Sequence, residues 1–241
     1  MVDSPPAVDR LADSMRHPIT QYLALIRDLA GDKVQGLTFF GAVVAGVFDP
    51  KRHTARNVLV MDEIDLTVLK QLAPHGPGLG KTAISAPLVM TPRYIKTSLD
   101  TFPLEFIEIT QMHLTVLGRD FFDSLSFDDA HVRLQCEREL KVLQMGLRQG
   151  LLASAGREKF VDALEQDVAE GLLRTLRGML WLKNTRDGKP AADVLDEVEK
   201  IIDRRLDGVR NALDPTAMHR FPEFQQLYRD VEHLGEVVDA W

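Results

Sequence analysis

The spacing of apolar residues along the chain changes once, close to residue 125. Before this point, short apolar runs alternate with amphipathic segments, and after it the apolar residues recur only every three or four positions. Alternating runs are typical of strands and helices in one domain, whereas a sustained helical spacing is typical of amphipathic helices. The pattern therefore predicts an α+β protein, in which a mixed sheet flanked by helices precedes an antiparallel helical bundle. We expect a leader over residues 1–17, an α/β domain over residues 18–125 and a bundle over residues 126–241.

In the first part, the predicted order is helix, strand, strand, helix, strand, helix, strand. Helical spacing begins at Pro18, which suits a first helical position, and ends at Gly31, which suits a helix stop. Thr91, which precedes a proline, predicts the cap of a later helix. Short apolar runs bounded by turn residues predict the strands. The expected strands cover residues 34–41, 56–64, 86–90 and 103–110, and short helices are expected over residues 65–74 and 91–102. Residues 42–48, between the first two strands, are compatible with a short helix.

Four amphipathic segments with short links follow, and they predict four antiparallel helices. Ser126 or Asp128 is expected to cap the first of them. On this helix Cys136 lies among leucines, which favours a packed thiol over a reactive one. The four segments cover residues 126–156, 157–184, 191–213 and 222–241.

Composition narrows the range of partners. The 241 residues carry a net charge of −7 with a pI near 5.5, so no overall basic field favours nucleic acid, and we do not expect a nucleic-acid partner. The single cysteine excludes an intrachain disulfide and favours a cytoplasmic setting. The N-terminus lacks the apolar stretch of a secretory signal, and no apolar run reaches the roughly 18 residues that a membrane span needs. The histidines show no zinc-binding spacing.

The stretch HGPGLGKT, residues 75–82, ends like a phosphate-binding loop. Such a loop needs a glycine five positions before the glycine of Gly-Lys-Thr, but His75 stands there. It must also follow a strand and begin a helix, whereas the predicted order here is the reverse. We therefore expect a Gly-rich surface loop without a nucleotide.

One stretch in the first part carries a resemblance to a known family. Residues 37–61 are LTFFGAVVAGVFDPKRHTARNVLVM, and they resemble the nucleotidyltransferase superfamily, in particular its small bacterial members. The family pattern has a glycine and a serine after an apolar strand, then a second glycine, then two aspartates spaced as D-x-D at the next apolar strand. Gly41 and Gly46 match the glycines, and residues 58–61 match the second strand. A helical bundle after the α/β domain is also similar to the family's layout.

The resemblance implies a chemistry and a set of site residues. Members transfer a nucleotidyl group from a nucleoside triphosphate to an acceptor, with two Mg²⁺ ions held by the D-x-D carboxylates and a third carboxylate from a neighbouring strand. By position, the resemblance assigns nucleotide binding to Gly41, Ala42, Gly46, Arg56 and Asn57.

At three functional positions this sequence departs from the family pattern. Ala42 replaces the serine, and Ala55 and Asn57 replace the two aspartates. Because the loss of both carboxylates removes the charge that holds Mg²⁺, we expect no metal site. The leading interpretation is a catalytically degenerate protein that acts by binding a nucleotide or a protein partner.

Two other interpretations stay open. In the first, the protein is an active nucleotidyltransferase that uses Mg²⁺ and a nucleoside triphosphate and takes its carboxylates from Glu63, Asp65 and Glu105. Against it, Asp65 suits the cap of the helix that follows. Glu105 is expected on the fourth strand, where it pairs with Arg56 or Lys51 or faces solvent. In the second interpretation, the chain is a structural homodimer module.

Overall fold

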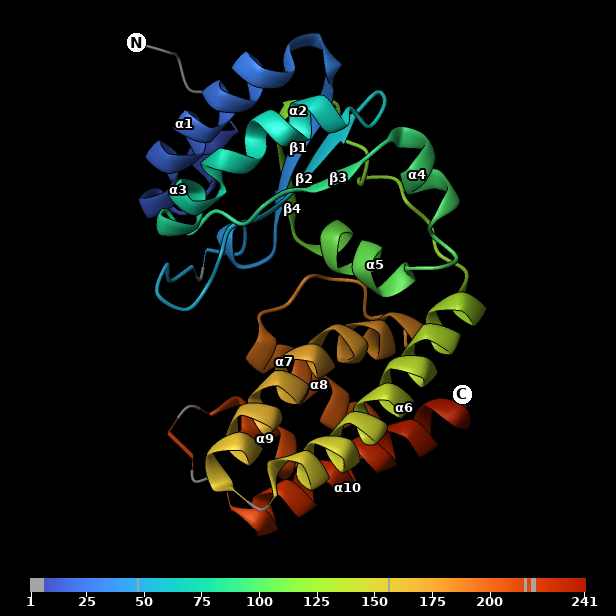
Figure 1. Cartoon of the computed structure of the whole chain (residues 1–241). Helices are drawn as coiled ribbons and strands as arrows, with labels where there is room; N and C mark the ends of the chain where they lie inside the picture. The colour runs from blue at the N-terminus through green and yellow to red at the C-terminus, as the bar shows by residue number, and fades with distance from the viewer. Residues whose placement is uncertain (1–6, 47, 156, 215, 218–219) are drawn as a thin grey trace. The chain divides into compact units, whose positions relative to one another are not determined.

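The structure, a computed structural model, divides the chain into two compact units (Figure 1). The sheet unit comprises Met1–Leu99 and Glu108–Ser126, and the helical unit comprises Asp100–Ile107 and Phe127–Trp241. The residues that the structure describes are 7–46, 48–155, 157–214, 216–217 and 220–241.

The sheet unit is built on a mixed four-stranded sheet in the order β3-β2-β1-β4. Strand β1 pairs antiparallel with β2 and with β4, while β2 pairs parallel with β3. This confirms the mixed sheet that the alternation of apolar runs predicts. The strands are β1 (Val34–Phe40), β2 (Arg56–Met61), β3 (Leu88–Met90) and β4 (His113–Gly118).

Helix α1 (Asp13–Ala30) covers one face of this sheet. Its buried residues Tyr22 and Ile26 join a hydrophobic core that includes Phe39 of β1 and Leu59 of β2. Alternate strand residues face this core because side chains in a strand point to opposite faces in turn. A second helix, α2 (Leu66–Leu72), contributes buried Val68 and Leu72 to the same core.

The start of α1 differs from the sequence prediction. The helix begins at Asp13, so Pro18 lies inside it, and Gly31 ends it with φ of +50° as expected. A short 3₁₀ turn, η1 (Val8–Arg10), precedes α1 and buries Val8, and another, η2 (Gly31–Lys33), follows it. Part of the expected leader is therefore helical and packed, while its first six residues lie outside the described chain.

The expected fourth strand is wrong. The run PLEFIEITQ forms helix α5 (Pro103–Gln111), and the sheet gains β4 from the next residues instead. A short apolar run fits a buried helix as well as a strand, so periodicity alone does not separate them. The residues of α5 up to Ile107 belong to the helical unit and those from Glu108 to the sheet unit. Thr91 caps the preceding helix α4 (Pro92–Thr97), as predicted, by accepting from Tyr94 N–H at 3.0 Å.

The stretch HGPGLGKT is helical, and the expected surface loop is wrong in conformation. It spans the end of the 3₁₀ turn η4 (Ala73–His75) and helix α3 (Gly76–Lys81), and none of the residues of these two elements is buried. No strand leads into it, because α2 precedes η4 directly. A phosphate-binding loop is therefore absent at this position.

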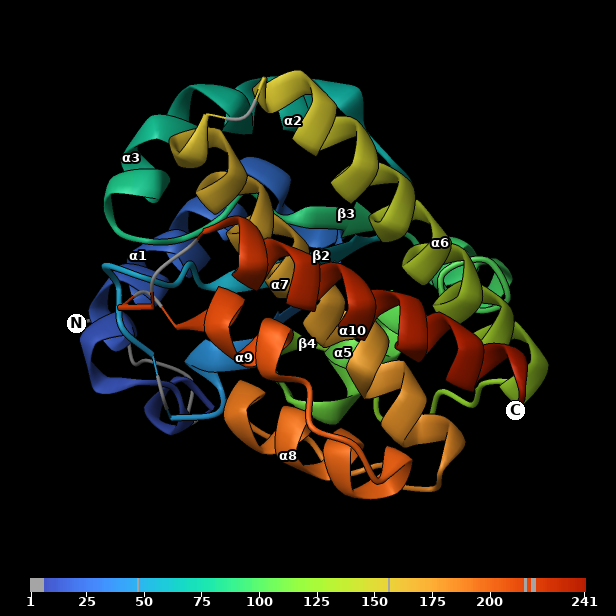
Figure 2. The same cartoon turned by 90° about the horizontal axis from the view of Figure 1, so that it is seen from below.

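The helical unit contains α6 (Asp129–Ser154), α7 (Glu158–Leu182), α8 (Ala191–Ile202), α9 (Asp207–Leu213) and α10 (Phe221–Asp239). Asp128 caps α6 through Ala130 N–H at 2.8 Å. Helix α10 lies along α6 (Figure 2), and the buried Cys136 is packed in the common core as predicted. Within the described chain, no helix is long and apolar enough to cross a membrane.

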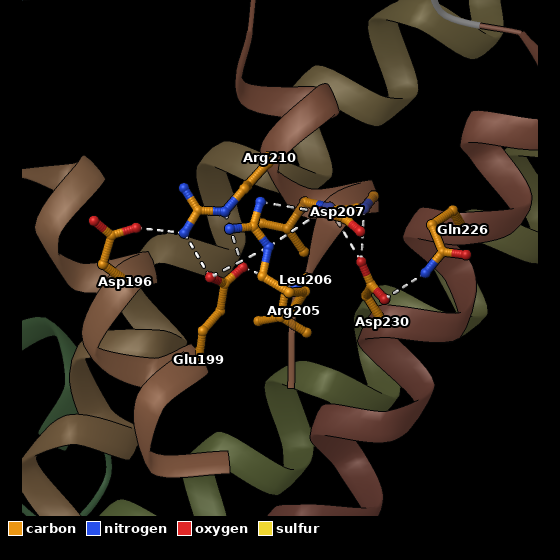
Figure 3. Close-up of polar contacts among 10 residues, drawn as sticks. Asp196, Glu199, Arg205, Leu206, Asp207, Arg210, Gln226 and Asp230 are labelled. Atoms are coloured by element: carbon orange, nitrogen blue, oxygen red, sulfur yellow. Dashed lines mark hydrogen bonds and ion pairs between the residues drawn. The ribbon is translucent and has the colours of Figure 1, made fainter. Parts of the chain in front are cut away.

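The predicted third helix of the bundle is broken into α8 and α9. Asp203 ends α8 in the left-handed region with φ of +50°, and Leu206 N–H donates to the Glu199 carboxylate at 2.8 Å (Figure 3). Arg210 of α9 folds back onto Glu199, with Nη2 at 2.6 Å from Oε2, and onto Asp196. These long-range ion pairs stabilise the break over the continuous helix that the local spacing favours.

Because Gly208 has no side chain, α9 can pack closely against α10 at this position. A Cβ atom at Gly208 would lie 2.2 Å from the backbone nitrogen of Leu227. The buried carboxylate of Asp230 on α10 accepts from Gly208 N–H at 2.8 Å, and Gln226 donates to its other oxygen at 2.9 Å (Figure 3). The first turn of α9 is thus satisfied by a side chain from another helix, which sequence spacing does not reveal.

Candidate functional site

The candidate site begins at the turn that follows β1. Gly41 and Gly46 have φ of +77° and +75°, the left-handed region that glycine adopts without strain. Gly41 N–H donates to Met112 O at 2.8 Å, and a 3₁₀ turn, η3 (Gly41–Val43), carries the partly exposed Ala42. The two glycines of the resemblance therefore stand where the backbone needs them.

Strand register brings a row of three side chains to the end of the sheet next to this turn. Phe40 of β1 pairs with Arg56 of β2 on one side and with His113 of β4 on the other. The Arg56 guanidinium lies 4.6 Å from the centre of the Phe40 ring. It also packs against the turn, because a Cβ atom at Gly41 would lie 3.0 Å from Arg56 Nη2. Arg56 thus occupies the space beside Gly41.

Glu108 of α5 neutralises Arg56. Arg56 Nη1 donates to Glu108 Oε2 at 3.1 Å, and Nη2 donates to Oε1, so the pair is bidentate. The Glu108 side chain is only 17% exposed while that of Arg56 is 43% exposed, so the carboxylate is the more desolvated partner. Bidentate pairs of this kind are among the stronger ionic contacts in proteins.

Glu105 takes no part in this pair, which corrects the expectation that it meets Arg56 or Lys51. It lies on a helix rather than a strand, and its contacts belong to the helical unit. Arg174 Nη1 lies 3.1 Å from one carboxylate oxygen, and Gln135 Nε2 donates to the other at 2.8 Å. No sequence spacing distinguishes Glu105 from Glu108, because the two lie less than one helical turn apart.

Asn57 lies on the opposite face of the sheet from Arg56, inside the core. It is 1% exposed, pairs with Phe39 across the strands, and accepts from the Tyr22 hydroxyl at 3.1 Å. Its Nδ2 donates to Ser85 O at 3.0 Å and weakly to Ala55 O at 3.4 Å. Burial raises the pKa of Tyr22, so its hydroxyl stays protonated and donates. Both ends of the Asn57 amide are used internally.

Ala55 is fully buried and forms part of the same core. The two positions that the resemblance assigns to metal-binding carboxylates therefore hold a core methyl group and a core amide. Neither presents an oxygen to the turn at Gly41, and the geometry does not suit a divalent cation there.

Glu63 and Asp65 lie past the other end of β2. A strand of six residues spans about 20 Å, so these carboxylates are far from the Gly41 turn. Asp65 caps α2 through Thr67 N–H at 2.7 Å, as its position predicts, and pairs with Lys33. The Lys33 hydrogen bond and the Thr67 N–H lower the pKa of Asp65 to about 2. Glu63 and Asp65 belong to the sheet unit, whereas Glu105 belongs to the helical unit.

A second polar pair sits at the β4 end of the row, and sequence analysis missed it. His113 Nε2 lies 3.1 Å from Asp120 Oδ2, and its Nδ1 lies 3.0 Å from Thr110 O. Burial raises the pKa of Asp120, but the Phe122 N–H and His113 outweigh it and the net shift is downward. Within the described residues, no three His, Cys, Asp or Glu side chains group closely enough to hold a metal ion.

Other polar groups have structural roles. The ionic network around Glu199 and Arg210 lines a pocket of about 470 Å³ in the helical unit, where acids and bases neutralise one another (Figure 3). Burial raises the pKa of Cys136 to about 12, so this thiol is not a nucleophile at neutral pH.

Among solved structures, the fold is similar to that of a spectinomycin adenyltransferase from Enterococcus faecialis, crystallised with ATP and spectinomycin. The two share 11% sequence identity with a TM-score of 0.54, and the match covers 92% of this chain and 98% of the other. The sequence matches no protein-family model and no curated protein. The comparison therefore shows the nucleotidyltransferase fold, in agreement with the resemblance at residues 37–61.

Proposed function

We propose that this chain is a catalytically inactive protein of the nucleotidyltransferase fold that binds nucleotide phosphates without a divalent metal. The observation that carries the proposal is the Arg56–Glu108 pair beside Gly41. Nucleotidyl transfer in this fold relies on carboxylate-bound metal ions, and Ala55 and Asn57 offer none. The Arg56 guanidinium places N–H donors beside the turn, where a bound metal ion would otherwise contact phosphate oxygens.

Arg56 keeps the capacity to bind an anion while it pairs with Glu108. A guanidinium has five N–H donors, and the pair with Glu108 uses two of them. The remaining donors include Nε, which lies 3.7 Å from a Cβ position built on Gly41 and so borders the turn. Planar guanidinium groups are well suited to phosphate oxygens. Lys51 and Arg52, exposed in the loop before β2, add positive charge to the same segment.

A protein with a similar fold also supports the proposal that this chain binds a nucleotide. The spectinomycin adenyltransferase with the similar fold was crystallised with ATP, and the glycine turn after β1 is retained in this chain with both residues left-handed. The glycine turn that the resemblance assigns to nucleotide binding is therefore present in this chain.

The test is a calorimetric titration of ATP into the protein, once with MgCl₂ and once with EDTA. We expect binding of the same affinity in both buffers and no transfer product in either. The variant Arg56→Gln should weaken binding about tenfold, because a charge-assisted hydrogen bond is lost. Glu108→Gln should tighten it, because the variant removes a negative charge that competes for Arg56. Arg93→Gln, an exposed arginine on α4, is the matched control and should leave the affinity unchanged.

Three results would overturn this proposal. Binding that requires Mg²⁺ would indicate a metal site and reopen the active interpretation. If the Arg56 and Glu108 variants bound ATP with the affinity of the wild type, the nucleotide would bind away from this ion pair. An absence of heat in both buffers would exclude ATP binding and favour a role in binding a protein partner.

A further inference from the structure

A pocket of about 270 Å³ opens between α6 and α10, within the helical unit. It differs from the ionic pocket around Glu199 because most of its lining is apolar. Leu151 comes from α6, while Phe221, Phe224 and Tyr228 come from α10. None of these four residues belongs to the site proposed for nucleotide.

Aromatic rings form one wall of this α6–α10 pocket. Phe221 and Phe224 stack at a centroid distance of 6.4 Å and an interplanar angle of 12°. Phe224 is 3% exposed and anchored in the core, but Phe221 is 55% exposed despite its apolar ring. A phenylalanine that is exposed while stacked on a buried one offers a flat apolar surface to a further ring.

Two arginines line the same pocket, and none of its described lining residues is a carboxylate. Arg148 donates through Nε and Nη2 to the Tyr228 hydroxyl, with the Nε bond at 2.8 Å, and its guanidinium lies 5.4 Å from the centre of the Tyr228 ring. Arg229 forms no hydrogen bond or ion pair with any residue that the structure describes. The remaining lining residue, Gln225, is uncharged.

The charge on these arginines is therefore not compensated from within the pocket. Arg210, by contrast, is neutralised by Asp196 and Glu199 in the ionic pocket (Figure 3). Because the Tyr228 hydroxyl accepts from Arg148, its own proton is free to donate to a ligand oxygen. The α6–α10 pocket thus combines a flat apolar wall with donors and positive charge.

We propose that this pocket binds a small aromatic carboxylate, with its ring on Phe221 and its carboxylate held by Arg148 and Arg229. Ligand pockets of drug size measure about 300–1,000 Å³, and this pocket falls just below that range. Its size suits one or two fused rings and excludes a nucleoside triphosphate. The site is therefore separate from the one proposed for nucleotide.

The test uses 2-naphthoate as the probe and its neutral analogue 2-naphthalenemethanol, each titrated calorimetrically into the full chain. We expect the acid to bind at least tenfold more tightly than the alcohol, because only the acid forms charge-assisted hydrogen bonds. Arg148→Gln and Arg229→Gln should each weaken naphthoate about tenfold and leave the alcohol unchanged. Arg138→Gln, an exposed arginine on α6 outside the pocket, should change neither.

Removal of the ring wall gives an independent check. Phe221→Ala should weaken both probes, whereas Tyr94→Ala, which removes an aromatic ring of similar exposure on α4, should weaken neither. Each of these side chains is exposed, so the variants should keep the melting temperature of the wild type. Equal binding of the acid and the alcohol, unchanged affinity in both arginine variants, or no binding of naphthoate would each overturn the proposal.

Discussion

The buried amide of Asn57 allows a sharp test of why this chain lacks the D-x-D carboxylates. Asn57→Asp restores one of them with almost no change in size. In the structure, Nδ2 donates to Ser85 O at 3.0 Å in a position that is 1% exposed. A carboxylate oxygen there would face a carbonyl oxygen instead of donating to it. None of the described cationic side chains is hydrogen-bonded to Asn57, so an ionised aspartate at this position would be buried with the Tyr22 hydroxyl as a donor but without a cation to neutralise it.

The cost has an upper limit, because the aspartate can escape by taking up a proton. A protonated carboxyl can donate to Ser85 O in place of the amide. Protonation at pH 7 of a group with an unfolded pKa of about 3.9 costs about 4 kcal/mol, since each pKa unit is worth about 1.4 kcal/mol. We therefore expect Asn57→Asp to lower the free energy of unfolding by about 2–4 kcal/mol at pH 7.

Burial also determines how the stability of Asn57→Asp depends on pH. Burial would raise the folded pKa of the new carboxyl above its unfolded value. The variant's stability relative to the wild type is then greatest below the unfolded pKa and is lost as the pH rises towards the folded pKa. At pH 5 the limit is only about 1.5 kcal/mol, so the difference between variant and wild type should shrink on acidification.

Urea denaturation of both proteins at pH 7 and pH 5 measures this difference. Tyr22→Phe is the control, because it removes the hydroxyl that donates to Asn57 without adding a titrating group. It should cost about 1–2 kcal/mol at both pH values. If Asn57→Asp were as stable as the wild type at pH 7, the position could accept a carboxylate and our reason for expecting no metal site there would be wrong. A deficit that does not depend on pH would refute the electrostatic reasoning.

Two further predictions concern the fold. Gly118→Ala should lower the free energy of unfolding by about 2–5 kcal/mol, because φ is +69° and a Cβ atom would lie 2.2 Å from Gln35 O. The control Gly46→Ala, at a glycine with φ of +75° and nothing within 4 Å of the added Cβ atom, should lower it by only about 1 kcal/mol. Equal losses of the two variants in urea denaturation would contradict the steric argument. Glu199→Gln should destabilise the helical unit at pH 7 by about 1–3 kcal/mol. Although burial raises the pKa of Glu199, hydrogen bonds from Arg210 and the Leu206 N–H lower it overall, so this contribution is present above the unfolded pKa and lost as the pH falls through the folded one. The gap in melting temperature between variant and wild type should narrow as the pH falls below the unfolded pKa of Glu199 and should close at the lower, folded pKa, and a constant gap would show that the charge of Glu199 is not responsible.

The sequence predicts those elements whose signal is local. The mixed sheet, the cap at Thr91 and the helix stop at Gly31 depend on neighbouring residues, and the structure confirms them. The run at residues 103–110 fails because four apolar positions in eight suit either a strand or a helix. The residues of β4, HLTVLG, alternate between polar and apolar at their start, and the apolar ones Leu114 and Val116 are buried. The longer apolar run that precedes them resembles a strand more strongly in the sequence.

Long-range contacts account for what the sequence could not predict. The break between α8 and α9 depends on Arg210 reaching Glu199, eleven positions away. In the site, Arg56 lies beside the glycine turn, and its partner Glu108 is 52 residues distant along the chain. Neither distance has a spacing rule that would point to the pair. The face on which Asn57 lies depends on strand register and on the position of α1, and a motif does not carry that information.

The structure also changes what the missing carboxylates mean. If Ala55 and Asn57 bordered an open metal site, two substitutions to aspartate would go far towards restoring it. Both side chains instead lie on the face that packs against α1, where Asn57 holds Tyr22 and Ser85. The opposite face carries the Arg56–Glu108 pair. Restored aspartates at 55 and 57 would therefore enter the core, and Arg56 would still occupy the space beside the turn. For that reason we expect any nucleotide binding by this chain to be independent of a divalent metal.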